Sequence, residues 1–273
     1  GITGIVNLIS VLETGQDLRG KEWPELAEIA RQIGRIILIP VLNVDGRARI
    51  PQRMFVHRGD DSTIYQCWGT GAWADGNNIG WPQCKEFIPL DFAKTMFPGG
   101  YPNDGGVNIQ HDDFFSPNRQ PETEALLQLC AEERPDLISN MHTGAPGNNY
   151  YIRMHRPFVE AALAPTFDRL YAAVHGGLAK AGLQSTDDPA LEGDPTKAPR
   201  GVYNLDTALN LHCGALPMVI ESPCHGFSGK DRAGNVVFPD PDSLVDQQLT
   251  CHREIMRFLL ENGGRCAWTP EGR

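Results

Sequence analysis

Apolar residues recur along the chain at two different spacings, and these spacings predict its helices and strands. Residues 2–12 carry apolar side chains three and four positions apart and are followed by Gly15, which predicts a helix with one apolar face. The same spacing predicts further helices at 23–33, 157–182 with a break at Pro165, 203–211 and 242–263, the last capped by Asp242 or Ser243. Another helix is expected from Gln120 to about Glu133, because a proline and acidic residues stand in its first turn.

Continuous apolar runs predict strands that are covered on both faces. Arg35–Leu42 is apolar and rich in β-branched residues, and it ends in the turn sequence Asn43-Val-Asp-Gly46. Leu216–Glu221 is another such run. The stretch Pro135–Gly144 passes through Leu137 and Ile138 into a polar turn, which is typical of a buried parallel strand with His142 at its carboxyl end. Shorter strands are expected at 106–114 and 149–153. Strands alternate with helices, so the predicted fold class is α/β with a largely parallel sheet.

Two of these strands end in a side chain that can take part in chemistry, His142 and Glu221. In an α/β sheet, ligands and catalytic groups collect at the carboxyl ends of the strands. A neutral imidazole is a good zinc ligand, and a carboxylate beside it is a good general base. Taken alone, however, His142 is explained more simply as a core histidine, and Glu221 as a cap or an ion-pair partner.

Cys224 and His225 follow the second of these strands and raise the alternative of a thiol nucleophile with a base. Neighbouring residues of an extended chain point in opposite directions, so this pair is disfavoured. The seven cysteines contain no Cys-x-x-Cys pair, which excludes zinc-ribbon and thioredoxin-like proteins. Cys67 and Cys84 bracket a loop in which a disulfide is conceivable, and the odd count leaves at least one thiol.

The composition of the chain bears on which classes of partner the protein can have. The 273 residues carry a net charge of −10, which argues against nucleic-acid binding because no basic stripe can displace counterions. No apolar run is long enough to span a bilayer. The chain opens at Gly1 rather than at a methionine, so the missing targeting segment carries no information.

Residues 47–113 are rich in Gly, Pro, Asn and Trp and show little periodicity. A loop region of this length inside a domain is usually functional. It contains Arg47, Arg49, Arg53 and Arg58, although a solvated surface position explains any single one of them more simply.

Several motifs now stand in a recognisable order: Asn43-Val-Asp-Gly46, Gly106-Val-Asn-Ile-Gln-His111, Pro121-Glu-Thr123, His142, Tyr203 and Glu221. Their order from Gly1 to about Gly226 resembles the zinc carboxypeptidases of the carboxypeptidase A type (funnelins). The resemblance implies one catalytic domain over 1–273 that lacks its N-terminal strands. It also implies a three-layer fold, with a mixed, mostly parallel sheet between helices.

The resemblance also implies an activity, zinc-dependent hydrolysis of peptide or small amide substrates. His142 matches the third zinc ligand, and Glu221 matches the general base that activates a zinc-bound water. Arg58 suits the catalytic arginine that stabilises the oxyanion, with Arg53 and Arg47 as reserves. The substrate would be bound by Tyr203, Gln110, His111 and Asn43.

The chain departs from the family pattern in two places. The His-x-x-Glu pair is absent, so the two other zinc ligands are expected ahead of Gly1, and this chain alone is predicted to bind zinc poorly. Gln110-His111 replaces the usual Asn-Arg, whose guanidinium clamps a C-terminal carboxylate through two hydrogen bonds.

Asp112 and Asp113 would suit a substrate amine or would face solvent.

Two alternatives therefore remain open. The first is a deacylase of N-acyl amino acids on the same fold. The second is a binding domain without metal or catalysis.

Overall fold

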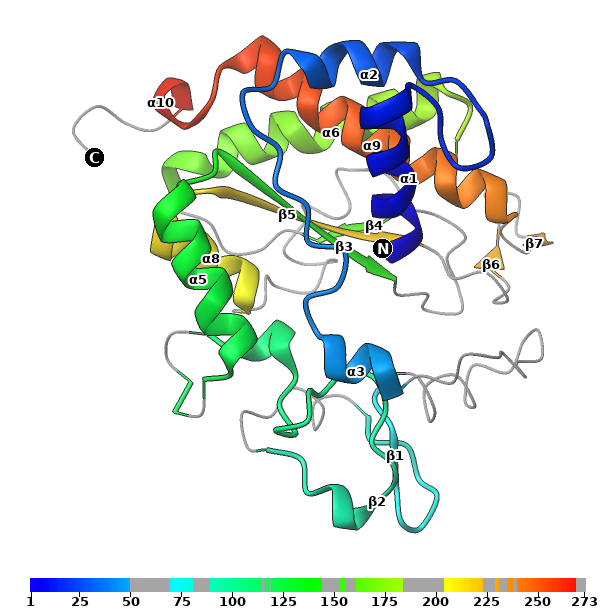
Figure 1. Cartoon of the computed structure of the whole chain (residues 1–273), viewed down its shortest axis with the longest axis vertical. Coiled ribbons are helices and arrows are strands. Elements are labelled where there is room, and N and C mark those ends of the chain that lie inside the picture. The colour runs from blue at the N-terminus through cyan, green and yellow to red at the C-terminus, as the bar shows by residue number, and fades with distance from the viewer. Residues whose placement is uncertain are drawn as a thin grey trace. The chain divides into compact units, whose positions relative to one another are not determined.

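The structure is a computed structural model in which two compact units can be described (Figure 1). It describes residues 1–49, 69–80, 89–113, 116–117, 119–143, 153–155, 161–183, 204–222, 229–230, 235–237 and 240–268. The first unit consists of Gly1–Pro40, Asp136–Val202 and Gly214–Arg273, and the second of Val41–Pro135 and Tyr203–Cys213. Helices and strands are mixed in the sequence, so the broad α/β class is confirmed. Among the described helices, none combines the length and apolar character that crossing a bilayer requires.

The first unit is built on a three-stranded sheet. Its strands are β3 (Leu137–Thr143), β5 (Leu216–Ser222) and β4 (Arg153–His155), with β5 in the centre. β3 and β5 are parallel, whereas β4 runs antiparallel to β5, so the sheet is mixed. The strands predicted within 135–144 and at 216–221 are confirmed. β4 begins at Arg153, the last residue of the strand predicted at 149–153, and residues 149–152 lie outside the described residues.

One face of this sheet packs against two helices, α6 (Ala164–Lys180) and α9 (Pro241–Asn262). Alternate strand residues point to this face because side chains alternate along a strand. The cluster contains the following residues of β3, β5, α6 and α9: Leu137, Met141, Leu216, Met218, Ile220, Phe167, Leu170, Val174, Leu178, Cys251, Ile255 and Phe258. The opposite face of β3 and β5 carries the intervening residues, His142 and Glu221 among them.

A second apolar cluster joins α9 to α1 (Ile2–Thr14) and α2 (Pro24–Arg31). α1 ends as predicted at Gly15, which has a φ of +80° and closes the helix by donating to the carbonyl of Val11. Gly4 lets α1 approach α9 closely, because a Cβ at this position would overlap the side chain of Gln248.

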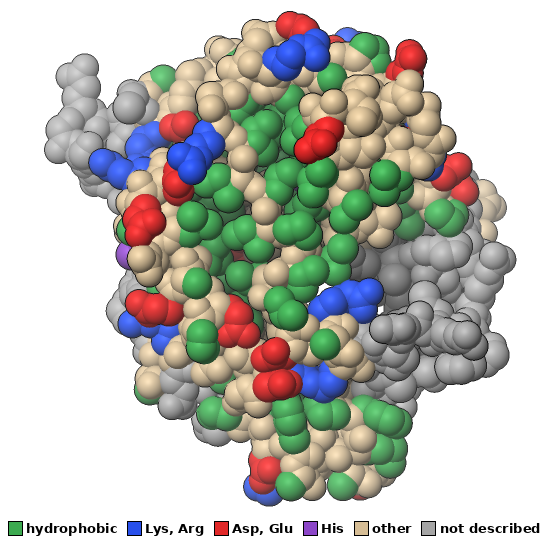
Figure 2. Space-filling model, in the orientation of Figure 1, with side chains coloured by type: hydrophobic (Ala, Val, Ile, Leu, Met, Phe, Trp, Pro, Cys, Tyr) green, Lys and Arg blue, Asp and Glu red, His purple; other side chains and the backbone are tan. Residues whose placement is uncertain are grey.

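The strand predicted at Arg35–Leu42 is wrong: in the described part of the chain this segment pairs with no strand. Ile36 and Leu38 pack on the second cluster, while Ile37 and Ile39 are exposed. The segment has the extended alternation of a strand, but a strand also needs a hydrogen-bonded neighbour. Hydrophobic side chains gather on the face that carries α1 and this segment, as Figure 2 shows.

Two helix starts in the first unit differ from the prediction. The cap of α9 is Asp240, whose Oδ2 accepts the backbone N–H of Ser243 at 3.0 Å, and not Asp242 or Ser243. Pro165 lies in the first turn of α6, where its missing N–H costs nothing, so it opens a helix that it was expected to break. A 3-10 turn, η4 (Ala161–Leu163), precedes α6.

The second unit contains short elements joined by turns. They are α3 (Val44–Arg49), β1 (Ala72–Trp73), η2 (Phe92–Lys94), β2 (Thr95–Phe97), η3 (Ile109–His111), α5 (Pro121–Glu133) and α8 (Leu205–Cys213). α5 and α8 confirm the predicted helices. The strand predicted at 106–114 is wrong, because the Asn108 side chain accepts the N–H of Gln110 and starts η3. The remaining elements, in the first unit, are β6 (Gly229–Lys230), β7 (Val236–Val237) and α10 (Arg265–Trp268).

Candidate functional site

His142 and Glu221 stand directly opposite each other at the carboxyl ends of β3 and β5. The parallel register pairs the two residues, so both side chains leave the same face of the sheet. The Nδ1 atom of His142 lies 3.6 Å from Oε1 of Glu221, and the two side chains are 28% and 16% exposed. This distance is slightly long for a direct hydrogen bond, so the two groups are neighbours without a normal hydrogen bond between them.

The backbone behind this pair is fixed by buried hydrogen bonds. Ser222 follows Glu221 and donates its hydroxyl to the carbonyl of His142 at 3.2 Å, which ties the two strand ends together. Gln248 of α9 donates its amide Nε2 to the same hydroxyl at 2.9 Å. Ser222 and Gln248 are both buried, so the strand ends are held from the side that faces α9.

The zinc site that the resemblance implies needs nitrogen or oxygen donors from several side chains. One imidazole nitrogen beside one carboxylate is suitable donor chemistry for a single ligand and a base. Within the described residues, however, no group of three His, Cys, Asp or Glu side chains comes together. A catalytic zinc site needs three protein ligands, so His142 and Glu221 alone would not complete one.

The other predicted residues that the structure describes, Asn43, Gln110 and His111, belong to the second unit. Gln110 donates Nε2 to Oδ2 of Asp206 at 2.5 Å, which joins η3 to the first turn of α8. His111 is buried next to it. A buried carboxylate thus fixes the amide of Gln110, and sequence reasoning gave no role to Asp206.

Asn43 uses its side chain to order the backbone of its own unit. Its Oδ1 accepts the N–H of Gly46 at 2.9 Å, which starts α3 where a plain turn was expected. Its Nδ2 donates to the carbonyl of Tyr101 at 2.8 Å. The amide therefore already has partners on both sides, and a role in substrate binding stays a prediction.

Asp112 and Asp113 are both buried, so the alternative that they face solvent is wrong. Oδ2 of Asp112 accepts the backbone N–H of Gln120 at 2.8 Å and so fixes the start of α5. Its Oδ1 is buried without a hydrogen-bond partner among the described residues.

The remaining sequence predictions lie outside the described residues. They concern Arg58, Arg53, Tyr203, the Cys67–Cys84 disulfide and the Cys224–His225 pair. Of the other arginines in the same loop region, Arg47 is exposed, and Arg49 binds the backbone of its own unit.

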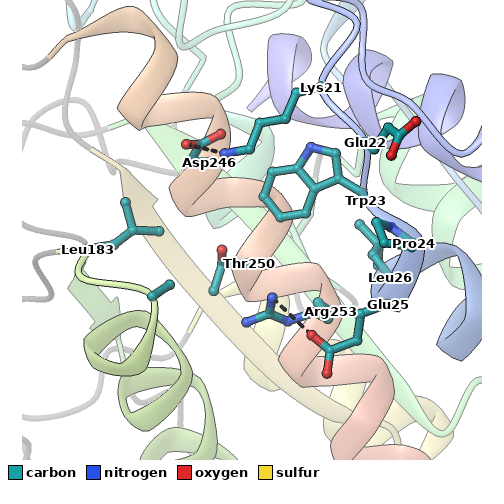
Figure 3. A pocket seen from close by; sticks show the side chains of 11 residues that line it. Lys21, Glu22, Trp23, Pro24, Glu25, Leu26, Leu183, Asp246, Thr250 and Arg253 are labelled. Carbon is teal, nitrogen blue, oxygen red and sulfur yellow. Dashed lines mark hydrogen bonds and ion pairs between the residues drawn. The ribbon is translucent and has the colours of Figure 1, made fainter.

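A pocket of about 320 Å³ lies elsewhere in the first unit, between the start of α2, the end of α6 and α9 (Figure 3). Trp23 forms one wall, and Lys21 lies 5.0 Å from the centre of its ring. Lys21 pairs with Asp246 at 2.7 Å, and Arg253 pairs with Glu25 at 3.3 Å. The mouth of this pocket is thus lined by neutralised ion pairs, and no predicted site residue contributes to it.

Trp23 is held in place by a hydrogen bond to Asp17, a buried carboxylate that sequence reasoning missed. Burial alone would raise the pKa of Asp17, but hydrogen bonds from Arg19, Trp23 and two backbone N–H groups outweigh it and lower this pKa to about 2. The signal that could have found it is the Asp17-Leu-Arg-Gly20 turn directly after the first helix.

Comparison with known proteins adds no relative to this geometry: no family model, no curated protein and no solved structure matches the chain.

Proposed function

We propose that this protein is a zinc-dependent hydrolase of peptide or amide bonds, similar to the metallocarboxypeptidases. The observation that carries the proposal is the His142–Glu221 pair, opposed in register at the ends of parallel strands with its polar atoms 3.6 Å apart. An imidazole and a carboxylate that leave the same sheet face at a functional edge are the minimum that such chemistry needs. The proposal includes the three-layer carboxypeptidase-like fold, of which the α6 and α9 layer is described.

In this proposal each residue has one task. A zinc ion held at this site would supply Lewis-acid chemistry to the substrate carbonyl and to a water molecule. His142 holds the ion through a ring nitrogen. Glu221 accepts a proton from the attacking water and returns it to the leaving amine nitrogen. Ser222 and Gln248 keep the two strand ends at a constant separation.

The proposal places the other zinc ligands in residues ahead of Gly1. The position of Gly1 supports this, because a Cβ on Gly1 would lie 2.7 Å from the carbonyl oxygen of Met141. Met141 is the neighbour of His142 in β3. Gly1 therefore lies beside the strand end that carries His142.

The substrate is a peptide or a small amide. Gln110 occupies the position where the family has an asparagine, and its bond to Asp206 holds it in place. His111 provides no guanidinium fork for a C-terminal carboxylate. This difference favours the second candidate function, deacylation of N-acyl amino acids, in which the carboxylate need not be clamped in the same way.

The test is a hydrolysis assay on a protein that includes the residues ahead of Gly1, with and without a chelator. Glu221→Gln should lower kcat by about 10³-fold, within the usual range for loss of a general base, and should leave bound zinc unchanged. His142→Gln should lower zinc content as measured by elemental analysis. The matched control is Glu28→Gln on the exposed side of α2, which should retain full activity.

Activity that survives in Glu221→Gln would refute the mechanism. Hydrolysis of N-acyl amino acids but not of peptides would decide for the deacylase. If the complete protein contained no zinc and showed neither activity, the metal-free binding domain would be the remaining candidate.

A further inference from the structure

Two cysteines of the second unit lie against each other, one on each of its longer helices. Cys130 is on the last turns of α5, and Cys213 is the final residue of α8. The Cys213 thiol lies close enough to Cys130 to raise the pKa of the Cys130 thiol, and burial adds to this effect. Both are free cysteines in the structure, so the contact is between two reduced side chains.

The two helices hold these thiols in register. His212 donates Nε2 to the backbone carbonyl of Leu127 at 3.0 Å, one turn before Cys130 on the same face of α5. The thiol of Cys213 donates to the carbonyl of Leu209 at 3.1 Å, which sets its rotamer. Because Leu127 and Cys130 are both buried, this face of α5 is fixed against α8 by packing as well.

We propose that Cys130 and Cys213 are a disulfide-forming pair, which low-molecular-weight disulfides of the glutathione type oxidise to a bond between α5 and α8. A disulfide can form only between side chains that already lie near each other, and the contact between α5 and α8 holds Cys130 and Cys213 in this way. The inference is independent of the hydrolase proposed above, because it uses no residue of the His142–Glu221 site.

The order of events follows from exposure. Cys213 is partly exposed and Cys130 is buried, so the reagent meets Cys213 first. The nearby Cys213 thiol and burial raise the pKa of the Cys130 thiol, which makes Cys130 the poorer first nucleophile.

The chemistry balances in two exchanges. Cys213 loses its proton to solvent, and its thiolate attacks one sulfur of the small disulfide, which releases one small thiolate. Cys130 then loses its proton and attacks the Cys213 sulfur, which releases the second. The two protons are taken up by the leaving thiolates, so two cysteines are oxidised and one small disulfide is reduced to two thiols.

The bond would fix the carboxyl end of α8. This helix begins at Leu205, two residues after Tyr203, and its Asp206 holds Gln110. Oxidation therefore restrains the helix that follows one predicted substrate residue and contacts another.

The experiment is peptide mapping of the full chain after incubation with oxidised glutathione and alkylation of the remaining thiols. Cleavage after glutamate leaves Cys130 in peptide 125–132 and Cys213 in peptide 193–221, each as the only cysteine of its peptide, so a bond between them can be assigned. The expected product is a Cys130–Cys213 peptide pair, two hydrogens lighter than the sum of the separate peptides and lost on reduction. The matched variants are Cys213→Ser, which should abolish this pair, and Cys224→Ser, which should retain it.

Two results would overturn the proposal. One is a Cys213 that ends linked to another cysteine. The other is a Cys213 that stays capped by glutathione while Cys130 remains alkylatable under folded conditions. Mapping of the unmutated chain decides between these outcomes even if a serine variant does not fold.

Discussion

The two units of the molecule are ordered by different interactions. Both apolar clusters found among the described residues lie in the first unit, where α1, α2, α6 and α9 bury them. In the second unit, single polar side chains bind backbone groups across turns. Asn103, for example, accepts the N–H of Val107 and donates to Gln120.

Arg49 is the clearest example of a polar side chain that orders the backbone of the second unit. Its guanidinium donates to the carbonyls of Gly99 and Pro102 and pairs with Asp104, and it lies 4.9 Å from the ring centre of Phe92. One side chain thus joins four positions of the chain. Burial in the first unit is shared by many side chains, whereas order in the second depends on a few specific ones.

The largest effect is expected where the apolar clusters are broken. Phe167→Ala in α6 should lower the free energy of unfolding by about 3–5 kcal/mol, because a fully buried ring is lost and a cavity is left. Urea unfolding followed by circular dichroism measures this change. Leu18→Ala, at a position that is 65% exposed, is the control and should change stability by less than about 0.5 kcal/mol. Equal effects of the two variants would contradict the assignment of the core.

A second prediction uses two buried histidines of the first unit. Burial lowers the pKa of His175 and of His252 to about 4. A histidine that stays neutral when folded but ionises when unfolded stabilises the fold above pH 6.5. This stability is lost as the pH falls from 6.5 towards 4.

The loss amounts to at most about 3 kcal/mol per histidine. Chemical unfolding at several pH values should therefore show stability falling below pH 6.5, and falling less in His175→Asn and in His252→Asn. A slope that is unchanged in both variants would show that neither ring is held neutral.

This comparison also explains which parts of the fold the sequence predicts. The helices at 2–14 and 241–262 and the strands β3 and β5 follow from apolar spacing, because spacing directly reports which face is buried. The pair of His142 and Glu221 follows from the same argument, since both end parallel strands. The strand predicted at Arg35–Leu42 is wrong, because a continuous apolar run indicates burial but cannot show that a hydrogen-bonded neighbour is missing.

Outside α5 and α8, the elements of the second unit could not be predicted from the sequence, for a different reason. Its order comes from side chains that accept backbone N–H groups, as Asn43 and Asn108 do, and from glycines with positive φ such as Gly99 and Gly106. A Cβ at Gly99 would lie 2.2 Å from the carbonyl oxygen of Gly69, so only glycine fits. Such contacts have no period along the chain, and a sequence pattern does not reveal them.

A smaller effect is expected at the junction between the apolar core and the candidate site. Ser222→Ala removes the acceptor of the Gln248 amide and the donor to His142, and Oε1 of Gln248 already has no partner among the described residues. The loss should be about 2 kcal/mol, as for other buried polar groups left unsatisfied. Ser139→Ala in β3 is the matched control, because its hydroxyl contacts only the sulfur of Met141 among the described residues, at 3.5 Å, and it should cost less. If Ser139→Ala were the more harmful change, Ser222 would not be the residue that ties the strand ends.

The smallest effect is expected in the second unit, where Arg49→Lys keeps the charge but loses the planar group that reaches several acceptors at once. The ammonium can retain the pair with Asp104, which is largely exposed and contributes little, so the loss should come from the carbonyls of Gly99 and Pro102 and amount to about 1 kcal/mol. Hydrogen exchange is the suitable measurement, because it reads each unit separately. Amides of residues 99–107 should exchange faster in Arg49→Lys, while those of β3 and β5 keep their rates. Arg47→Lys, an exposed position on the same helix, should change neither set. Faster exchange in β3 as well would mean that the two units unfold together. The first unit, with its many shared apolar contacts, and the second, with its few ordering side chains, would then not be independent in stability.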